Sequence, residues 1–198
     1  MTTLRKYYRY FSVTSTQSVL EGFFLEMPLR KLAQDPYKLL RVMGLREGHV
    51  LLDVGCGTGF LAFPAASIVG DKGLVYAVDI SDKYLWKLRQ RAAKLCVKNI
   101  LPVRARAEEL DGVPDRSADR VVFMLSLHHI EDKGRALSQV RRKMKQDSLL
   151  MVYEPIASRM LGHGTEPSEI IPLLRQKGFE PYLFEKGRLF WAAIFTPL

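Results

Sequence analysis

Apolar runs and amphipathic stretches alternate along most of the chain. Short, mainly apolar segments predict five strands, over 49–54, 74–79, 99–104, 120–125 and 149–153. Between two of these segments, apolar residues such as Leu85, Leu88 and Ala92 recur at helical spacing, with lysines and arginines on the other face. Strands that alternate with helices are typical of a mostly parallel sheet covered by helices. The predicted fold class is therefore α/β, a doubly wound, Rossmann-like domain.

The pattern changes toward the end of the chain. A helix is expected over about 168–177 and ends at Gly178. Two further apolar segments, 179–184 and 189–195, are separated by the short turn 185–188, which predicts an antiparallel hairpin. With this hairpin at its C-terminal end, the predicted sheet has seven strands, most of them parallel.

Residues 1–45 lie outside this alternation, so we treat them as an N-terminal helical cap segment and 46–198 as the core domain. Asp35 and Pro36 form a favourable helix start, and Gly44 a favourable stop. The segment before them is rich in aromatic residues: Tyr7, Tyr8, Tyr10, Phe11, Phe23 and Phe24. Two compatible interpretations stay open. The segment packs against the sheet or its helices, or it forms a lid that excludes water from a ligand site.

Composition narrows the protein class. With 47% hydrophobic residues, the 198-residue chain has ample material for a packed core, which excludes general disorder. No apolar run is long enough to span a bilayer, and the N-terminus does not resemble a secretory signal. Two cysteines, Cys56 and Cys96, cannot build a disulfide framework or a cysteine-only metal site. We therefore expect a cytoplasmic protein.

The chain is basic, with 30 Lys and Arg against 21 Asp and Glu and a formal net charge of +9. Such a charge favours nucleic acid or another acidic partner, although basic residues spread over two predicted helices are more simply explained as solvated outer faces. Asparagine occurs once, at Asn99. Together with abundant arginine, this depletion is a compositional hint of a thermophilic source.

A glycine-rich turn follows the first predicted strand. Gly55, Gly57 and Gly59 let the backbone turn sharply into a helix whose free N–H groups suit a carboxylate or phosphate. Asp79, at the end of the next strand, can accept both hydroxyl protons of a ribose. A dinucleotide site requires glycine where this chain has the bulky Phe60, so the pattern does not favour NAD.

The turn and its neighbours resemble a known family. Asp53 followed by Gly-x-Gly-x-Gly resembles motif I of the class I S-adenosylmethionine-dependent methyltransferases. The segments 78–81, 106–110 and 117–122 resemble that family's second-strand end, adenine region and fourth strand, in the same order. The resemblance covers roughly 45–198. Within the family, the chain resembles the small-molecule branch that includes quinone C-methyltransferases. The resemblance implies S-adenosyl-L-methionine as cofactor, S-adenosyl-L-homocysteine as product, and no metal.

The resemblance also implies a set of cofactor-binding residues: Asp53, Gly55, Cys56, Gly57, Gly59, Asp79, Ile80, Ala107, Glu108 and Leu125. In this set, the glycine turn borders the methionine part of the cofactor, Asp53 orients its ammonium group and Asp79 holds the ribose. Ile80 packs on the adenine, while its edge is met either by the side chain of Glu108 or by a backbone contact. Leu125 lies at the strand end that faces the sulfonium.

The predicted fourth strand ends in Leu-His-His, at positions 127–129. Nucleic-acid amino-methyltransferases have an Asn/Asp-Pro-Pro-Tyr/Phe sequence here, and its absence argues against exocyclic base amines. A hydroxyl or carbon acid acceptor requires a base, and His128 or His129 is of the right residue type. The alternative is that one histidine faces the helix layer and the other forms a pocket wall. Tyr153 and Glu154, at the end of the fifth strand, are further acceptor-side candidates.

These observations favour an S-adenosylmethionine-dependent methyltransferase that acts on a small-molecule acceptor. Two alternatives stay open: an RNA or protein-lysine methyltransferase that uses the basic surface, and a non-catalytic subunit with a cofactor fold. The complete glycine set with Asp79 disfavours the non-catalytic alternative, because loss of catalysis would relax the need for an open cofactor site.

Overall fold

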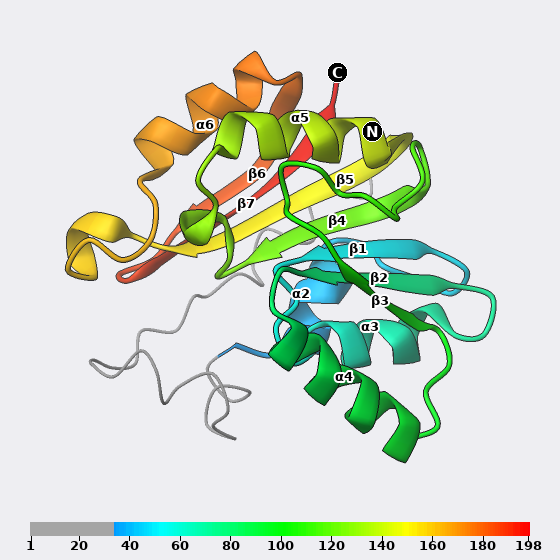
Figure 1. Cartoon of the computed structure of the whole chain (residues 1–198). Helices are drawn as coiled ribbons and strands as arrows, with labels where there is room; N and C mark the ends of the chain where they lie inside the picture. Colours follow the sequence, from blue (N-terminus) through cyan, green and yellow to red (C-terminus); the bar gives the residue numbers. More distant parts are fainter. Residues whose placement is uncertain (1–33) are drawn as a thin grey trace.

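The computed structural model describes residues 34–198, which form a single seven-stranded sheet with helices on both faces (Figure 1). The strands are β1 (Val50–Val54), β2 (Leu74–Asp79), β3 (Ile100–Arg104), β4 (Ala118–Met124), β5 (Met144–Pro155), β6 (Phe179–Lys186) and β7 (Phe190–Pro197). Their order is β3-β2-β1-β4-β5-β7-β6. Neighbours from β3 to β5 pair in parallel, whereas β7 is antiparallel to β5 and β6. The predicted sheet and its antiparallel hairpin are confirmed.

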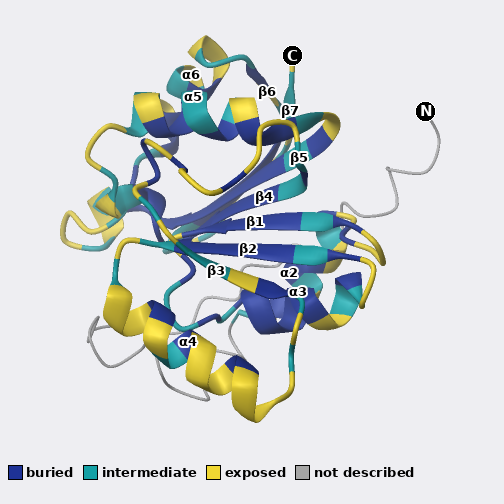
Figure 2. Ribbon diagram, turned by 45° about the vertical axis from the view of Figure 1, so that its right-hand side comes forward, coloured by how far each residue is buried: buried dark blue, intermediate teal, exposed yellow. Residues whose placement is uncertain are grey.

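The helices are divided between the two faces. One face carries α2 (Pro36–Val42), α3 (Ala62–Val69) and α4 (Asp82–Lys94), and the other carries α5 (Lys133–Lys143) and α6 (Pro167–Gln176) (Figure 1). Two short 3-10 helices, η3 (Leu127–His129) and η4 (Ala157–Arg159), follow β4 and β5. The central strands β1, β2 and β4 are largely buried, whereas the edge strands β3 and β6 are partly exposed and the outer side of α4 is exposed (Figure 2). The basic run on α4 therefore lies on a solvated surface, as the pattern predicts.

Alternation along the central strands divides the core into two apolar clusters. Leu51 packs with Leu85 and Leu88 of α4 on one face of the sheet. The next residue, Leu52, packs with Val140 and Leu174 on the other. A central parallel strand must be apolar on both faces, which explains why these segments are continuous hydrophobic runs.

The helix start predicted at Asp35 is confirmed. One carboxylate oxygen of Asp35 accepts hydrogen bonds from the backbone N–H groups of Tyr37 and Lys38, and Pro36 occupies the first turn. After the helix, Gly44 has a φ of 63°, as expected of a glycine stop. The aromatic residues before position 34 lie outside the described residues, so the cap segment over 1–45 stays a prediction.

The main difference from the prediction is the length of β5, which runs from 144 to 155 rather than from 149 to 153. At its start, Met144 pairs with Ala118 of β4. At its end, Glu154 pairs with Trp191 of β7, a partner distant in sequence. The added residues are therefore held in the strand by pairing that the local pattern does not reveal.

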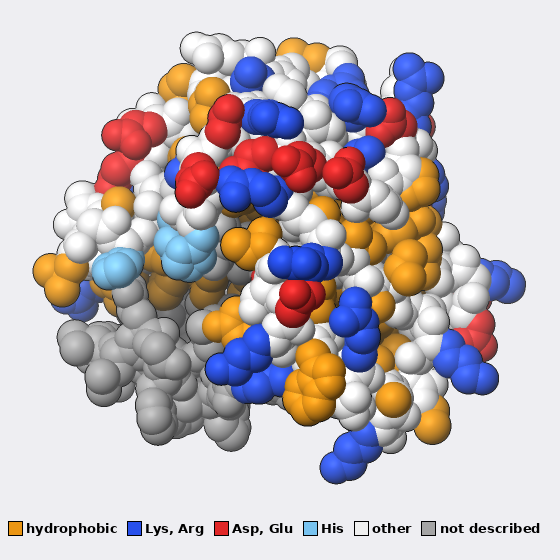
Figure 3. Space-filling view, in the orientation of Figure 1, with side chains coloured by type: hydrophobic (Ala, Val, Ile, Leu, Met, Phe, Trp, Pro, Cys, Tyr) orange, Lys and Arg blue, Asp and Glu red, His pale blue; other side chains and the backbone are white. Residues whose placement is uncertain are grey.

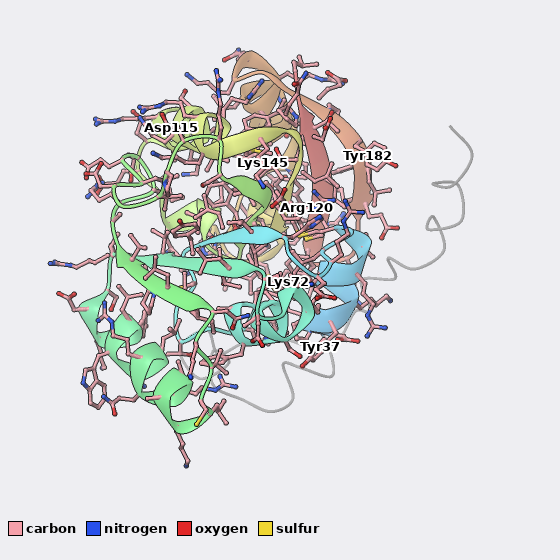
Figure 4. All side chains as sticks on the ribbon, turned by 90° about the vertical axis from the view of Figure 1, so that its right-hand side faces the viewer. Tyr37, Lys72, Asp115, Arg120, Lys145 and Tyr182 are labelled. Carbon is pink, nitrogen blue, oxygen red and sulfur yellow. The ribbon has the colours of Figure 1, made fainter. Side chains whose placement is uncertain are left out.

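An ion pair between Asp119 and Lys145 joins the amino-terminal ends of β4 and β5. Lys145 and Arg120 are labelled in Figure 4. Both oxygens of Asp119 accept from Nζ of Lys145, at 2.8 and 2.9 Å, and one also accepts from the backbone N–H of Val50 at 2.8 Å. Burial alone would raise the pKa of Asp119, but these donors hold the pKa below its ordinary value of 3.8. Nearby, Arg120 donates to the carbonyl of Met43 and so ties the end of α2 to β4.

No helix within residues 34–198 combines the length and the apolar character needed to cross a membrane.

Replacing Asp119 with Asn should lower the free energy of unfolding by about 1–2 kcal/mol at neutral pH, because the charged acceptor of Lys145 and Val50 is lost. The lowered pKa means that this contribution is present above the unfolded-state value and is lost as the pH falls through the folded-state value. Urea unfolding should therefore show the two proteins converging below about pH 4. Asp147→Asn, at an exposed position, is the matched control. A difference that persists at low pH would contradict the ion pair as its source.

Candidate active site

The topology places a crevice-forming switch point between β1 and β4. From β1 the chain proceeds to β2 and β3 on one side, and later returns to β4 and β5 on the other. In open α/β sheets, ligands bind outside the carboxyl ends of the strands at such a point. The predicted cofactor-binding and catalytic residues lie at or just beyond the carboxyl ends of β1, β2, β3 and β4, so the fold brings them to one edge of the sheet.

The glycine turn after β1 has the backbone geometry that its sequence predicts. Gly55, Gly57 and Gly59 have φ angles of 77°, 54° and 91°, a region that residues with a Cβ rarely adopt. The N–H groups of Gly55 and Cys56 both donate to the carbonyl of Val78, at 2.8 and 3.0 Å. A Cβ on Gly57 would meet nothing within 4 Å, so this part of the turn borders open space.

Asp79 holds the turn from the neighbouring strand. One carboxylate oxygen accepts from the N–H of Gly57 at 2.9 Å, and the other accepts from the N–H of Ser81 at 2.8 Å. Each oxygen retains acceptor capacity, so a pair of ligand hydroxyls can still bind. The next side chain, Ile80, is 63% exposed and offers an apolar surface beside this carboxylate.

The turn lies in a negative electrostatic environment. Burial, followed by the charges of Asp53 and Asp79, raises the pKa of the Cys56 thiol far above its ordinary value. Cys56 therefore stays protonated and is not a nucleophile. The same two carboxylates favour a positively charged ligand, and Asp53, only 2% exposed, acts from within β1.

The region after β3 is tied inward. Ala107 and Glu108 are both buried, and one oxygen of Glu108 accepts from Arg106 at 3.2 Å and from the N–H of Asp132 at 3.4 Å. A hydrogen bond to Glu131 and the charge of Glu108 raise the pKa of Arg106. Glu108 is thus not an exposed helix-start residue, and its contact with adenine stays a prediction.

The end of β4 is fixed by the side chain of Glu154, which is fully buried. One of its oxygens accepts from the N–H groups of Ser126 and Leu127, both at 2.8 Å. The other oxygen lies 2.6 Å from Nδ1 of His128. Glu154 is therefore turned inward rather than toward an acceptor, and its neighbour Tyr153 likewise packs against another ring, that of Phe190.

The two histidines lie side by side. Their ring centroids are 3.9 Å apart and the rings are tilted by 43°. The side chain of His128 is 13% exposed. Histidine side chains are visible on the side of the molecule on which β4 and β5 end (Figure 3). The structure thus brings the predicted bases to the same edge of the sheet as the glycine turn.

Ser126 is a site residue that the sequence analysis missed. Its Oγ donates to the carbonyl of Val54 at 2.7 Å, and its Cβ would be 2.4 Å from a Cβ on Gly55. The signal available in the sequence was a small hydroxyl residue directly after a buried strand. Leu125, just before it, has a φ of 55° and donates its N–H to Tyr153.

Within residues 34–198, no group of three or more His, Cys, Asp or Glu side chains is placed to hold a metal ion.

Comparison with known proteins identifies relatives of this architecture. Residues 45–182 match a family model described as a methyltransferase domain. The chain is 37% identical over 119 residues to the ubiquinone/menaquinone biosynthesis C-methyltransferase UbiE of Shewanella oneidensis, covering 58% of this chain and 46% of that protein. It is 37% identical over 112 residues to UbiE of Psychromonas ingrahamii, covering 56% and 44%. The matches span less than half the length of these curated relatives.

Solved structures share the fold. A SAM dependent methyltransferase from Aquifex aeolicus has a TM-score of 0.77 and 25% identity, covering 88% of this chain and 95% of that chain. The PH0226 protein of Pyrococcus horikoshii has a TM-score of 0.73 and 20% identity over 98% and 99% of the two chains, a likeness of fold alone.

The residues present fit S-adenosyl-L-methionine, the cofactor that the sequence resemblance implies. The open space beside Gly57 leaves room for the ligand, and Asp79 has acceptor capacity for ribose hydroxyls. The charges of Asp53 and Asp79 suit a ligand that carries a sulfonium and an ammonium group.

Gly55→Ala should weaken cofactor binding and destabilise the fold, because the new Cβ would collide with Cβ of Ser126. Gly48→Ala is the matched control, since Gly48 has nearly the same φ, 78°, but nothing within 4 Å of its added Cβ. Both variants bear the backbone strain, about 1 kcal/mol, and only the first bears the clash. Adding Ser126→Gly to Gly55→Ala should restore part of the affinity. Equal effects at the two glycines, measured by calorimetry and thermal unfolding, would contradict this explanation.

Proposed function

The chain belongs to the methyltransferase-domain family, and from this premise we propose that it methylates a carbon atom of a hydroxyl-bearing small molecule. The observation that carries the proposal is the placement of two half-sites at one switch point. Asp79 and the glycine turn lie after β2 and β1, and His128 lies after β4. The curated relatives are named as C-methyltransferases of ubiquinone and menaquinone biosynthesis, which supports a hydroquinone-like acceptor.

The first half-site binds the cofactor. The backbone of the glycine turn borders its methionine part, Asp79 accepts the ribose hydroxyls, and Ile80 packs on the adenine. The negative charge of Asp53 orients the ammonium group. When bound, S-adenosyl-L-methionine supplies an electrophilic methyl group on a positively charged sulfur, and the protein contributes chiefly by alignment in a site shielded from water.

The second half-site activates the acceptor. A base that removes the hydroxyl proton of a phenol or hydroquinone leaves negative charge on oxygen and, by conjugation, on the adjacent ring carbon. The histidine pair after β4 supplies such a base. The absence of Asn/Asp-Pro-Pro-Tyr/Phe at this strand end supports an acceptor other than a nucleobase amine.

The surface charge favours a small molecule over RNA. In the basic run 141–145, Arg142 and Lys143 pair with Asp115, and Lys145 pairs with Asp119. Over the visible face, lysines and arginines are interleaved with acidic side chains rather than gathered in one patch (Figure 3). A groove that tracks a phosphate backbone requires a continuous basic surface instead.

Asp79→Ala should weaken the binding of S-adenosyl-L-methionine by about 1–3 kcal/mol, roughly 5- to 150-fold, because the acceptor of the ribose hydroxyls is lost. Calorimetric titration of the wild type should show binding of S-adenosyl-L-methionine and S-adenosyl-L-homocysteine, and none of NAD. The matched control is Asp71→Ala, in an exposed turn. Unchanged affinity in Asp79→Ala would remove this residue from the site, and no binding by the wild type would favour the non-catalytic alternative.

The acceptor class is tested with labelled S-adenosyl-L-methionine. We expect label on a ring carbon of 1,4-dihydroxynaphthalene kept reduced, and none on bulk RNA or on lysine-rich protein. Label on oxygen, RNA or lysine would contradict the proposed acceptor class. The Asp79→Ala variant is the control for label that arrives without the cofactor site.

A further inference from the structure

The carboxylate of Glu154 is buried within the sheet and is stabilised there by hydrogen-bond donors. Its side chain has no exposed surface, although it lies near the end of β5, a strand paired on both sides. Burying a charged carboxylate is unfavourable unless hydrogen-bond donors replace the water that it loses. Three donors do so: the N–H groups of Ser126 and Leu127 on one oxygen, and the ring of His128 on the other.

This contact determines which ring nitrogen of His128 carries a proton. An ionised carboxylate can only accept hydrogen bonds, so Nδ1, at 2.6 Å from Glu154, must be the donor. A neutral imidazole has a single N–H group, and Nε2 is then left as an acceptor. His128 contacts the carboxylate of Glu154, whereas His129 packs its ring against the ring of His128.

We propose that Glu154 is a positioning residue that holds His128 in the Nδ1–H form, so that Nε2 of His128 is the base for the acceptor hydroxyl. The proposal deepens the proposed function and rests on it. It selects His128 from the histidine pair, and it assigns Glu154 to a role that acts through another side chain.

The proton movements are balanced. The hydroxyl proton of the acceptor passes to Nε2, and the imidazolium that forms is stabilised at Nδ1 by the Glu154 carboxylate. The ring carbon forms its bond to the methyl group while the methyl–sulfur bond breaks, and both electrons of that bond stay on sulfur. The ring carbon then loses its hydrogen as a proton when aromaticity returns. The hydroxyl oxygen is reprotonated, and one proton is released overall.

The carboxylate of Glu154 also sets the position of His128 relative to the glycine turn. Ser126, held by Glu154 through its N–H, uses its Oγ to bind the carbonyl of Val54, directly before Gly55. A continuous chain of hydrogen bonds thus runs from the end of β1 to the ring of His128. Catalytic groups are held in productive geometry by such supporting contacts, and small displacements are costly.

Glu154→Gln tests the proposal with almost no change of shape. The amide oxygen can keep the bonds to Ser126 and Leu127, and the amide NH₂ then faces Nδ1 of His128 and donates to it. The ring proton moves to Nε2, and the base is lost. We expect kcat with 1,4-dihydroxynaphthalene to fall about 10²- to 10⁴-fold. The affinity for S-adenosyl-L-methionine should change by no more than about twofold.

Two comparisons separate positioning from general structural support. The matched control Glu169→Gln, on the exposed side of α6, should keep the wild-type kcat. In a His128→Ala background, Glu154→Gln should cause no further loss, because its effect acts through the ring. Unchanged kcat in Glu154→Gln, or a further loss in the double variant, would overturn the proposal.

Nitrogen NMR of the imidazole rings gives a readout that needs no acceptor. At about pH 8.5, His128 of the wild type should show its only N–H at Nδ1, and Glu154→Gln should show it at Nε2. A wild-type N–H at Nε2, in the neutral or the doubly protonated ring, overturns the proposal. If the glutamine variant does not fold, the wild-type spectrum alone decides. Absence of cofactor binding by the wild type, in contrast, contradicts the proposed function itself.

Discussion

The site depends on the close approach of Ser126 to the backbone at Gly55. The strands β1 and β4 are parallel neighbours, and beyond their ends the chain must diverge to opposite sides of the sheet. A Cβ on Gly55 would lie 2.4 Å from that of Ser126, so only glycine lets the two turns touch. The hydrogen bond from Ser126 to Val54 then fixes the glycine turn after β1 and the turn after β4 that carries His128 relative to each other.

Carboxylates held by backbone N–H groups provide the electrostatics of this edge. Asp79 accepts from Gly57 and Ser81, and Glu154 accepts from Ser126 and Leu127, so each acid fixes a turn while it stays charged. Buried or half-buried negative charge is stabilised by such donors without a cationic side chain. The charges of Asp53 and Asp79, which add to the effect of burial in raising the pKa of Cys56, suit a cationic cofactor that loses its charge when the methyl group leaves.

Local sequence patterns predicted the elements that depend on neighbouring residues. They did not predict the orientation of side chains that is set by contacts with residues distant in sequence. Leu74–Asp79 is a strand over the predicted range because its residues are apolar on both faces, and the cap at Asp35 works through its own neighbours. The inward turn of Glu154 depends on the alternation of β5 and on the approach of His128 from η3, the turn after β4, so the sequence alone suggested an acceptor contact. Glu108 is similarly drawn inward by Arg106 and Asp132.

The carboxylates at the two ends of the sheet have different hydrogen-bond donors, and this difference bears on which acceptor the protein can bind. At the amino-terminal end, Asp119 is matched by a lysine and a backbone donor, which leaves a closed structural contact. At the carboxyl end, Asp79 is matched by backbone N–H groups alone and keeps lone pairs for ligand hydroxyls. Because cations such as Lys145 are consumed in structural pairs, the count of 30 Lys and Arg overstates the basic surface available to a nucleic acid. In the proposed function, a small acceptor that is brought to His128 requires no such surface.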